Sequence, residues 1–297
     1  MNLFTFIYLI GVYIILNLFQ GFKQIDLNDQ LIYSSFFILL IGIPHGAIDH
    51  VLFFKKRKIS KPKFYVLYIG LIFAFLILWH VSVFYSLIFF LLISAFHFGE
   101  SQFPHINIHP IFKNIFYFIW GISLLSTLMF YNIEELKSIT LFFDDTVVLE
   151  QVYDLSKVSI LFYSTNVFTF ISMFIFIFMK KIDLDRFFSE IFLLFLIHAT
   201  FYLFPFIIGF TLYFVALHSL KVMNDEYIFL KKETPNFKIL DFIKLLAPYS
   251  VLSICFTALL LFLSYNNIIG YSVPLLSIMI ISVITLPHAI VMNIFYN

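Results

Sequence analysis

Residues 64–98 read FYVLYIGLIFAFLILWHVSVFYSLIFFLLISAFHF, a run of about 35 residues that contains no Asp, Glu, Lys or Arg. A helix needs about 20 mostly apolar residues to cross the hydrocarbon core of a bilayer. The run is too long for one crossing and long enough for two, and we expect the division near His80–Ser82. This stretch therefore predicts a membrane protein made of helices.

The composition of the whole chain agrees with this prediction. Of its 297 residues, 62% are hydrophobic and 12% are charged, and the mean hydropathy is +1.01, whereas a soluble domain has about 25% charged residues. The single cysteine excludes a disulfide scaffold, and a net charge of +1 offers no field to attract nucleic acid. We expect an all-α, polytopic integral membrane helix bundle that forms a single transmembrane domain over residues 1–297.

The same length rule gives ten transmembrane spans in the whole chain. A second overlong run, residues 187–220, is divided at Pro205, because proline lacks the N–H group that an unbroken helix needs. The expected spans are residues 3–19, 31–54, 64–79, 82–99, 111–131, 158–179, 187–204, 206–222, 242–264 and 272–296. Merging the runs at both divisions gives the alternative of eight spans.

The basic residues orient these spans, because cytoplasmic loops are rich in Lys and Arg. With ten spans, 15 of the 18 basic residues lie on the side of both termini, and only Lys23, Lys137 and Lys157 lie on the other side. We therefore expect cytoplasmic termini and a multi-pass protein of the cell (inner) membrane. No basic residue precedes the first span and no small-x-small cleavage site follows it, so we expect a retained span rather than a signal sequence.

The longest polar stretch, residues 131–157, lies outside the cell in this topology. Its acidic residues are Glu134, Glu135, Asp144, Asp145, Glu150 and Asp154. We expect a solvated acidic loop that carries at most a surface helix.

Five of the nine histidines lie in the cytoplasmic half of even-numbered spans: His45, His50, His97, His218 and His288. An ionisable group inside the bilayer costs several kcal/mol unless it is paired or coordinated, so each is a candidate functional residue. At a rise of about 1.5 Å per residue, His45 lies about 13 Å from the cytoplasmic end of its span, His288 about 12 Å and His218 about 6 Å. Histidines at such similar depths can converge on one point.

The other four histidines have simpler explanations. His80 and His198 lie nearer the outer side, where we expect structural hydrogen bonds. His105 and His109 lie in the polar connection 100–110 and are expected to be solvated.

A metal site is the chemistry that the converging histidines favour. Neutral imidazole is the commonest protein ligand for transition metals, and a four-histidine set with little carboxylate suits Fe(II), Cu or Zn more than Mg or Ca. The expected ligands are His45, His97, His218 and His288. The alternative is four separate interhelical hydrogen bonds.

Polar residues next to these histidines are candidates to orient them, because a ligand histidine usually donates its second N–H to a carboxylate or carbonyl. Asp49 lies one helical turn after His45 on the same face. Asp49 and Glu100 are the expected orienting groups, and a direct pair between Asp49 and His50 is the alternative for that segment.

The residues around the histidines also favour close helix packing. Small residues let helices approach one another, and they are Gly46, Ala47, Ala95, Gly99, Ser219 and Ala289. Pro44 precedes His45 and Pro287 precedes His288, and each proline is expected to open its helix locally.

These same segments resemble the Brp/Blh family of membrane-embedded β-carotene 15,15′-dioxygenases, which are associated with microbial rhodopsins. The matching motifs are PHGAIDH at 44–50, SAFHFG at 94–99, Tyr213-Phe214 with His218-Ser219, and LPH at 286–288. The resemblance extends from the second to the tenth expected span.

The resemblance implies an oxidoreductase that uses O₂ to cleave the central double bond of β-carotene, giving two molecules of all-trans-retinal. It implies Fe(2+) held by histidines, with His45, His97 and His218 as the ligands and catalytic residues. It also implies a substrate dissolved in the lipid bilayer and a product that can be supplied to a rhodopsin.

One position departs from the family pattern. Many members carry another histidine one turn after the position that matches His218, and this chain has Val222 there. That histidine is dispensable, or the activity is altered, or His288 completes the ligand set, and we favour His288. Aromatic residues near the motifs are expected to line the path of the carotenoid: Phe96, Phe98, Tyr213 and Phe214.

A divalent-metal transporter is the main competing hypothesis, because intramembrane His and Asp also mark ion pathways. The absence of a second intramembrane carboxylate and of inverted repeats argues against it. A di-iron desaturase would need several closely spaced histidine pairs, and only His45 and His50 are close. A rhodopsin is excluded because no lysine lies in the middle of a span.

Overall fold

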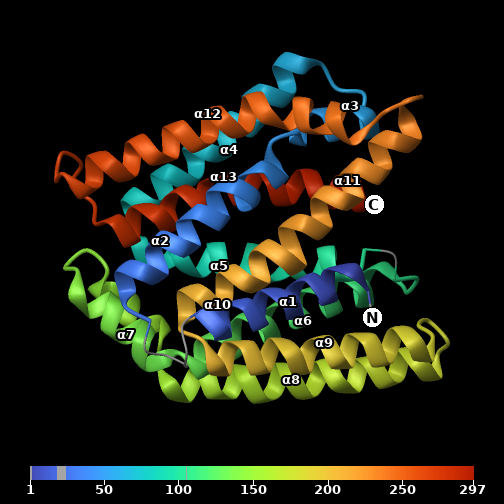
Figure 1. Cartoon of the computed structure of the whole chain (residues 1–297), viewed down its shortest axis with the longest axis horizontal. Helices are drawn as coiled ribbons and strands as arrows, with labels where there is room; N and C mark the ends of the chain where they lie inside the picture. Colours follow the sequence, from blue (N-terminus) through green and yellow to red (C-terminus); the bar gives the residue numbers. More distant parts are fainter. Residues whose placement is uncertain (1, 19–24, 105) are drawn as a thin grey trace.

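The computed structural model describes residues 2–18, 25–104 and 106–297, and all regular structure within these residues is helical (Figure 1). The elements are α1 (Leu3–Leu18), α2 (Leu27–Phe37), η1 (Ile38–Gly42), η2 (Ile43–Gly46), α3 (Asp49–Lys56), α4 (Lys61–Val81), α5 (Val83–Gln102), α6 (Pro110–Tyr131), α7 (Ile133–Phe142), η3 (Val147–Val152), α8 (Leu155–Phe178), α9 (Leu184–Leu203), α10 (Phe206–Leu212), η4 (Tyr213–Ser219), α11 (Leu220–Glu233), α12 (Ile239–Tyr265) and α13 (Val273–Tyr296). The prediction of an all-helical membrane bundle is confirmed.

Within the described ranges, nine helical segments are long and apolar enough to cross a membrane, and α1 is a shorter apolar helix of 16 residues. Both expected divisions are present. Ser82 is extended (φ −158°, ψ 109°) between α4 and α5, and Pro205 separates α9 from α10. The eight-span alternative is therefore wrong.

One span is longer than predicted. The apolar segment that begins at Phe206 continues as helix to Glu233, eleven residues beyond the expected end at position 222. The prediction stopped too early because Lys221, Asp225 and Glu226 resemble the start of a polar loop.

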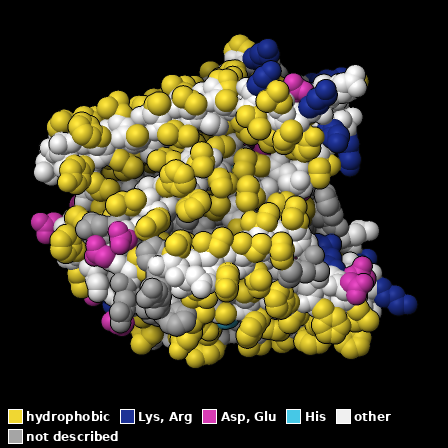
Figure 2. Space-filling view, viewed as in Figure 1, with side chains coloured by type: hydrophobic (Ala, Val, Ile, Leu, Met, Phe, Trp, Pro, Cys, Tyr) yellow, Lys and Arg dark blue, Asp and Glu magenta, His cyan; other side chains and the backbone are white. Residues whose placement is uncertain are grey.

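The axes of most long helices are roughly aligned, and both chain ends lie at the same end of the bundle (Figure 1). Lys and Arg side chains gather at that end on the face drawn in Figure 2, and acidic side chains are concentrated at the opposite end. The charge separation predicted from the sequence therefore follows the bundle axis, although Lys23 itself lies outside the described residues.

Helices α5 and α6 touch through their backbones at two glycines. A Cβ atom on Gly99 would collide with the carbonyl group of Tyr117, and one on Gly121 would collide with that of Ala95. The predicted role of Ala95 and Gly99 in close helix packing is confirmed, and glycine is required because no side chain fits between the two backbones.

The acidic segment 131–157 is more structured than predicted. It contains α7 and η3, and two of its carboxylates bind the first N–H groups of distant helices: Glu135 Oε2 accepts from Phe206 N and Asp145 Oδ2 from Ser272 N, both at 2.7 Å. The helix that the prediction allowed for is present as α7, but the loop is not simply solvated, because free N–H groups at helix starts attract carboxylates.

The aspartate at the end of this segment caps its own helix. Asp154 Oδ1 accepts from Lys157 N at 3.0 Å at the start of α8. A side-chain hydrogen bond from Ser156, followed by the Lys157 N–H, lowers the pKa of Asp154 below its usual value.

His198 forms a polar network between α6, α8 and α9, as expected for a structural histidine. Its Nε2 lies 3.0 Å from Asn166 Oδ1 and its Nδ1 lies 3.4 Å from Tyr131 OH. His80 is exposed at the last turn of α4, His109 accepts from Ile111 N at the start of α6, and His105 lies outside the described residues.

We predict that Gly121→Ala lowers the free energy of unfolding by about 1–3 kcal/mol, because the added methyl group pushes α6 away from α5. Thermal unfolding of the purified protein in detergent measures the effect. Gly70→Ala is the matched control, since a Cβ atom there meets nothing within 4 Å. Equal melting temperatures for the two variants would contradict the close contact.

Candidate metal centre

The four predicted ligand histidines come from four elements, and irregular backbone positions two of them. His45 lies in the 3-10 turn η2, directly after the π-helical turn η1, and His218 lies in the π-helical segment η4. A π turn rotates the residues that follow it relative to a regular helix, and such turns occur frequently at functional sites. The predicted opening at Pro44 is observed.

The other two histidines lie on regular helices. His97 lies in α5, and α13 continues from Val273 to Tyr296 through Pro287. Any local opening at Pro287 therefore does not interrupt the helix, because helices flanked by neighbours tolerate an internal proline.

The four imidazole rings form a closed circuit. Ring centroids are 4.7 Å apart for His45 and His288, 5.0 Å for His288 and His97, 4.8 Å for His97 and His218, and 5.2 Å for His218 and His45. Every neighbouring pair is nearly perpendicular, with interplanar angles of 81–86°. The structure thus brings together all four of the histidines that the sequence singled out.

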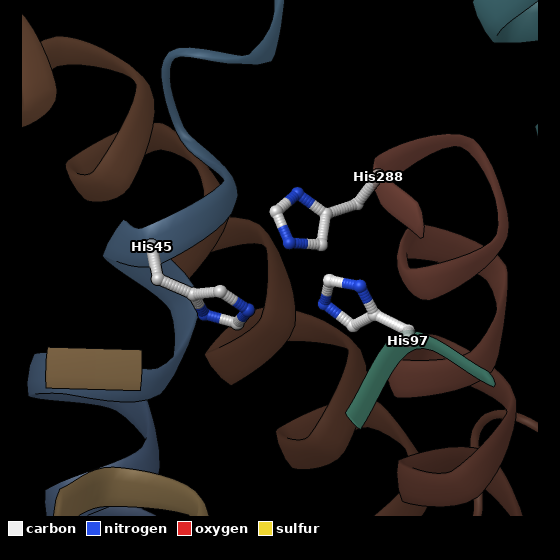
Figure 3. A group of neighbouring side chains, drawn as sticks. All are labelled: His45, His97 and His288. Carbon is white, nitrogen blue, oxygen red and sulfur yellow. The ribbon is translucent and has the colours of Figure 1, made fainter. Parts of the chain in front are cut away.

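Three of these rings offer nitrogens to one small volume. Ligand atoms of His45, His97 and His288 all lie within 4.8 Å of one another, and the three rings face a shared space in Figure 3. His218 joins the circuit by its ring contacts and is not part of this nitrogen group. A space bordered by imidazole nitrogens at such spacing can hold a transition-metal ion.

Hydrogen bonds orient three of the rings by one nitrogen each. His288 Nδ1 lies 2.8 Å from Asp49 Oδ1, His218 Nδ1 lies 3.1 Å from Ser101 Oγ, and His45 Nδ1 contacts the carbonyl oxygen of Gly42. A ring held at Nδ1 has Nε2 left to bind a metal ion.

The remaining ring nitrogens support this interpretation. Both nitrogens of His97 and the Nε2 atoms of His218 and His288 are buried and have no hydrogen-bond partner among the described residues. A buried polar atom without a partner costs about 1–3 kcal/mol, and coordination would remove that cost. The donor set therefore fits a metal ion.

The residues predicted to orient the ligand histidines make different contacts in the structure. Asp49 contacts His288, from a helix far away in the sequence, and its Oδ2 accepts from Tyr68 OH at 2.8 Å. Glu100 Oε1 accepts from Asn293 at 2.7 Å and ties α5 to α13. His50 lies outside the circuit and packs 4.7 Å from the ring of Tyr249.

The predicted carotenoid-lining aromatics fall into two groups. Phe98 and Phe214 line the large cavity described below, and their rings lie 4.9 and 5.5 Å from that of His218. Phe96 and Tyr213 pack between helices instead, against Tyr117 and Phe201 respectively.

A cavity of about 1370 Å³ opens from the histidines. It exceeds the roughly 300–1,000 Å³ of a site for a drug-sized molecule. Its lining is mainly apolar, and it includes all four histidines and reaches Asp145 and Tyr271 at the opposite end of the bundle from the termini. Along α13 the distance from His288 to Val273 is about 22 Å, so the cavity is long as well as large.

Two residues of the site were not anticipated, Tyr68 and Ser101. They carry no sequence signal, because tyrosine and serine are common in apolar helices. The buried carboxylate of Glu226, farther along the helix that follows His218, was also not singled out, because its charged neighbours resemble a polar loop.

The position of the missing family histidine is apolar. Val222 is fully buried and packs with Ile48 and Met292 in the core between α3, α11 and α13. A valine side chain has no atom that could bind a metal ion, so this position supplies no ligand.

Comparison with known proteins places this arrangement in a family. A sequence model of the family described as beta-carotene 15,15′-dioxygenase matches residues 36–296. The chain belongs to this family. The match includes all four histidines of the circuit and Asp49.

One curated relative of the beta-carotene 15,15′-dioxygenase family shows partial similarity. The beta-carotene 15,15′-dioxygenase of uncultured marine bacterium 66A03 is 35% identical over 86 residues, which is 24% of this chain and 31% of the relative. The alignment thus spans about a third of that relative's length. No solved structure matches the chain.

If the histidine circuit holds a metal ion, Asp49→Asn is predicted to lower its affinity for that ion by about 10–100-fold, the usual effect of losing a carboxylate behind a ligand histidine. Competition with a chelator, followed by elemental analysis, measures the affinity. Glu134→Gln, at an exposed position on α7, is the control. An unchanged affinity in Asp49→Asn would show that His288 needs no such partner.

Proposed function

We propose that this chain cleaves β-carotene at its central 15,15′ double bond with O₂ and releases two molecules of all-trans-retinal. One C=C bond breaks and two C=O bonds form, and each product takes one oxygen atom. The observation that carries the proposal is that the circuit of four buried histidines lines a long apolar cavity. The chain that holds this site belongs to the beta-carotene 15,15′-dioxygenase family.

We propose Fe(2+) as the resident ion, held by His45, His97, His218 and His288. A bound Fe(2+) would supply the O₂ activation that a conjugated alkene requires. The chain itself shields the four imidazoles from water, because all four are buried among apolar helices. Asp49 and Ser101 hold two of the rings at the angle that turns Nε2 inward.

The cavity has the properties that a carotenoid requires. A long hydrocarbon dissolved in the bilayer gains nothing from a polar site, and apolar walls exclude water from the reacting bond. Phe98 and Phe214 border both the histidines and the cavity, so their ring faces are placed to pack against a conjugated chain next to the ion.

We further propose that the protein spans the cell membrane with both termini in the cytoplasm. The gathering of Lys and Arg at the end that carries the termini supports this orientation. Retinal released into the same membrane would be available to a rhodopsin.

The metal-transporter hypothesis loses one of the arguments against it, because Glu100 and Glu226 are buried carboxylates within apolar helical segments in addition to Asp49. The family match favours the dioxygenase instead, and the apolar lining of the cavity fits a hydrocarbon better than an ion path.

We expect cells that accumulate β-carotene to lose their orange colour and gain retinal when they express this chain, measured by chromatography of extracted pigments. His97→Ala and His288→Ala are each expected to abolish cleavage, because each removes one ring of the circuit. The control is His80→Ala, at an exposed histidine. Intact carotene with well-expressed, iron-replete protein would refute the proposal, and full activity and iron content in His288→Ala would remove His288 from the ligand set.

The cavity makes a separate prediction. Ser277 lines it from α13, about 16 Å along the helix from His288, so Ser277→Trp should block the arm of the cavity that leads away from the histidines. We expect at least a tenfold loss of cleavage with unchanged metal content. Ser164→Trp, on an exposed face of α8, is the control, and wild-type cleavage by Ser277→Trp would show that the substrate lies elsewhere.

A further inference from the structure

Glu226 is a buried carboxylate that the reaction does not use. It lies on α11, its exposure is 0%, and neither of its oxygens has a hydrogen-bond partner among the described residues. It follows His218 by eight residues, which is about 12 Å along the helix axis toward the end that carries the termini. An unpartnered carboxylate in such a place requires an explanation.

The packing of α11 shows which way Glu226 faces. Val222 and Leu230, one turn before and after it, are both buried in the core formed with α3 and α13. Glu226 therefore lies on the face of α11 that is turned toward this core, to which α4 and α12 also contribute. Helices α3 and α13 carry Asp49 and His288, which are joined by a hydrogen bond at the histidine circuit.

The charges around Glu226 are acidic. Asp49 and Asp225 both interact with it electrostatically, and Asp225 Oδ2 also accepts a hydrogen bond from Tyr296 OH at 3.4 Å. Like charges in a medium of low dielectric constant raise each other's energy, and a cation between them lowers it. The group therefore has the electrostatics of a cation site, at an end of the bundle that is otherwise basic.

We propose that Glu226, with Asp225 beside it, is a transient binding site through which a divalent metal ion reaches the histidine circuit from the end of the molecule that carries the termini. A divalent cation is released more readily from carboxylate oxygens than a transition metal is from a set of imidazoles. An ion can therefore bind at Glu226 briefly and then transfer to the histidines. Asp49 interacts electrostatically with Glu226 and is hydrogen-bonded to His288, so it links the two sites. The inference rests on the proposed function, since it takes the histidines to be the resident metal centre.

The test is the rate at which metal-free protein takes up a metal. Purified full-length protein in detergent is stripped with a chelator and mixed with Co(2+), and metal bound after rapid separation is followed over time. Glu226→Gln keeps the shape of the side chain and removes its charge. We expect about tenfold slower uptake, the lower end of the rate enhancement that a focused field gives, with the same final amount of bound metal.

Two further variants complete the experiment. Glu233→Gln, at an exposed position on the same helix, should take up Co(2+) at the wild-type rate. Asp225→Asn should slow uptake by a smaller factor, and it provides a second measurement if Glu226→Gln does not fold, as judged by its melting temperature.

Each outcome decides the proposal. Wild-type uptake rates in Glu226→Gln, or in Asp225→Asn if that is the variant measured, would overturn it and leave Glu226 as a protonated acid within the core. A lower final metal content would also overturn it, because Glu226 would then belong to the resident site. Protein that binds Co(2+) but leaves β-carotene intact when loaded with iron would refute the proposed function alone, whereas wild-type protein that binds no metal would refute both.

Discussion

The contact between Asp49 and His288 is the interaction on which the arrangement of the site depends. It joins α3 to α13, and the Tyr68 hydroxyl on the other oxygen of Asp49 adds α4. A carboxylate surrounded by apolar helices is costly unless it is paired, so this pairing favours an arrangement in which the three helices meet at one depth. The side chains of the other three histidines in the circuit can then point toward His288 rather than toward solvent.

Irregular backbone segments position two of the other histidines in the circuit. A regular helix spaces its side chains by 100° and cannot aim every functional residue inward while keeping its apolar face toward its neighbours. The π-helical and 3-10 turns near His45 and His218 rotate those two rings toward the circuit, and the helices on either side keep their packing. Within the bundle these irregular turns follow α2 and α10 directly and carry His45 and His218.

Much of this architecture could be predicted from the sequence, because the bilayer makes each polar residue conspicuous. The breaks at Ser82 and Pro205 and the convergence of His45, His97, His218 and His288 follow from span length and depth alone. The partner of Asp49 could not be predicted, because it lies 239 positions away and depends on how the helices pack. Glu135 and Asp145 were misjudged for the same reason, since the helix starts that they bind are distant in sequence.

The backbone contact between α5 and α6 has a consequence for the metal centre. His97 lies between Ala95 and Gly99, which are two of the points where α5 is pressed against its neighbour. It is therefore the ring of the circuit whose backbone is fixed by direct main-chain contact with a neighbouring helix. The other three rings are each held by a hydrogen bond at Nδ1, so the circuit combines one ring placed by backbone packing with three placed by polar contacts.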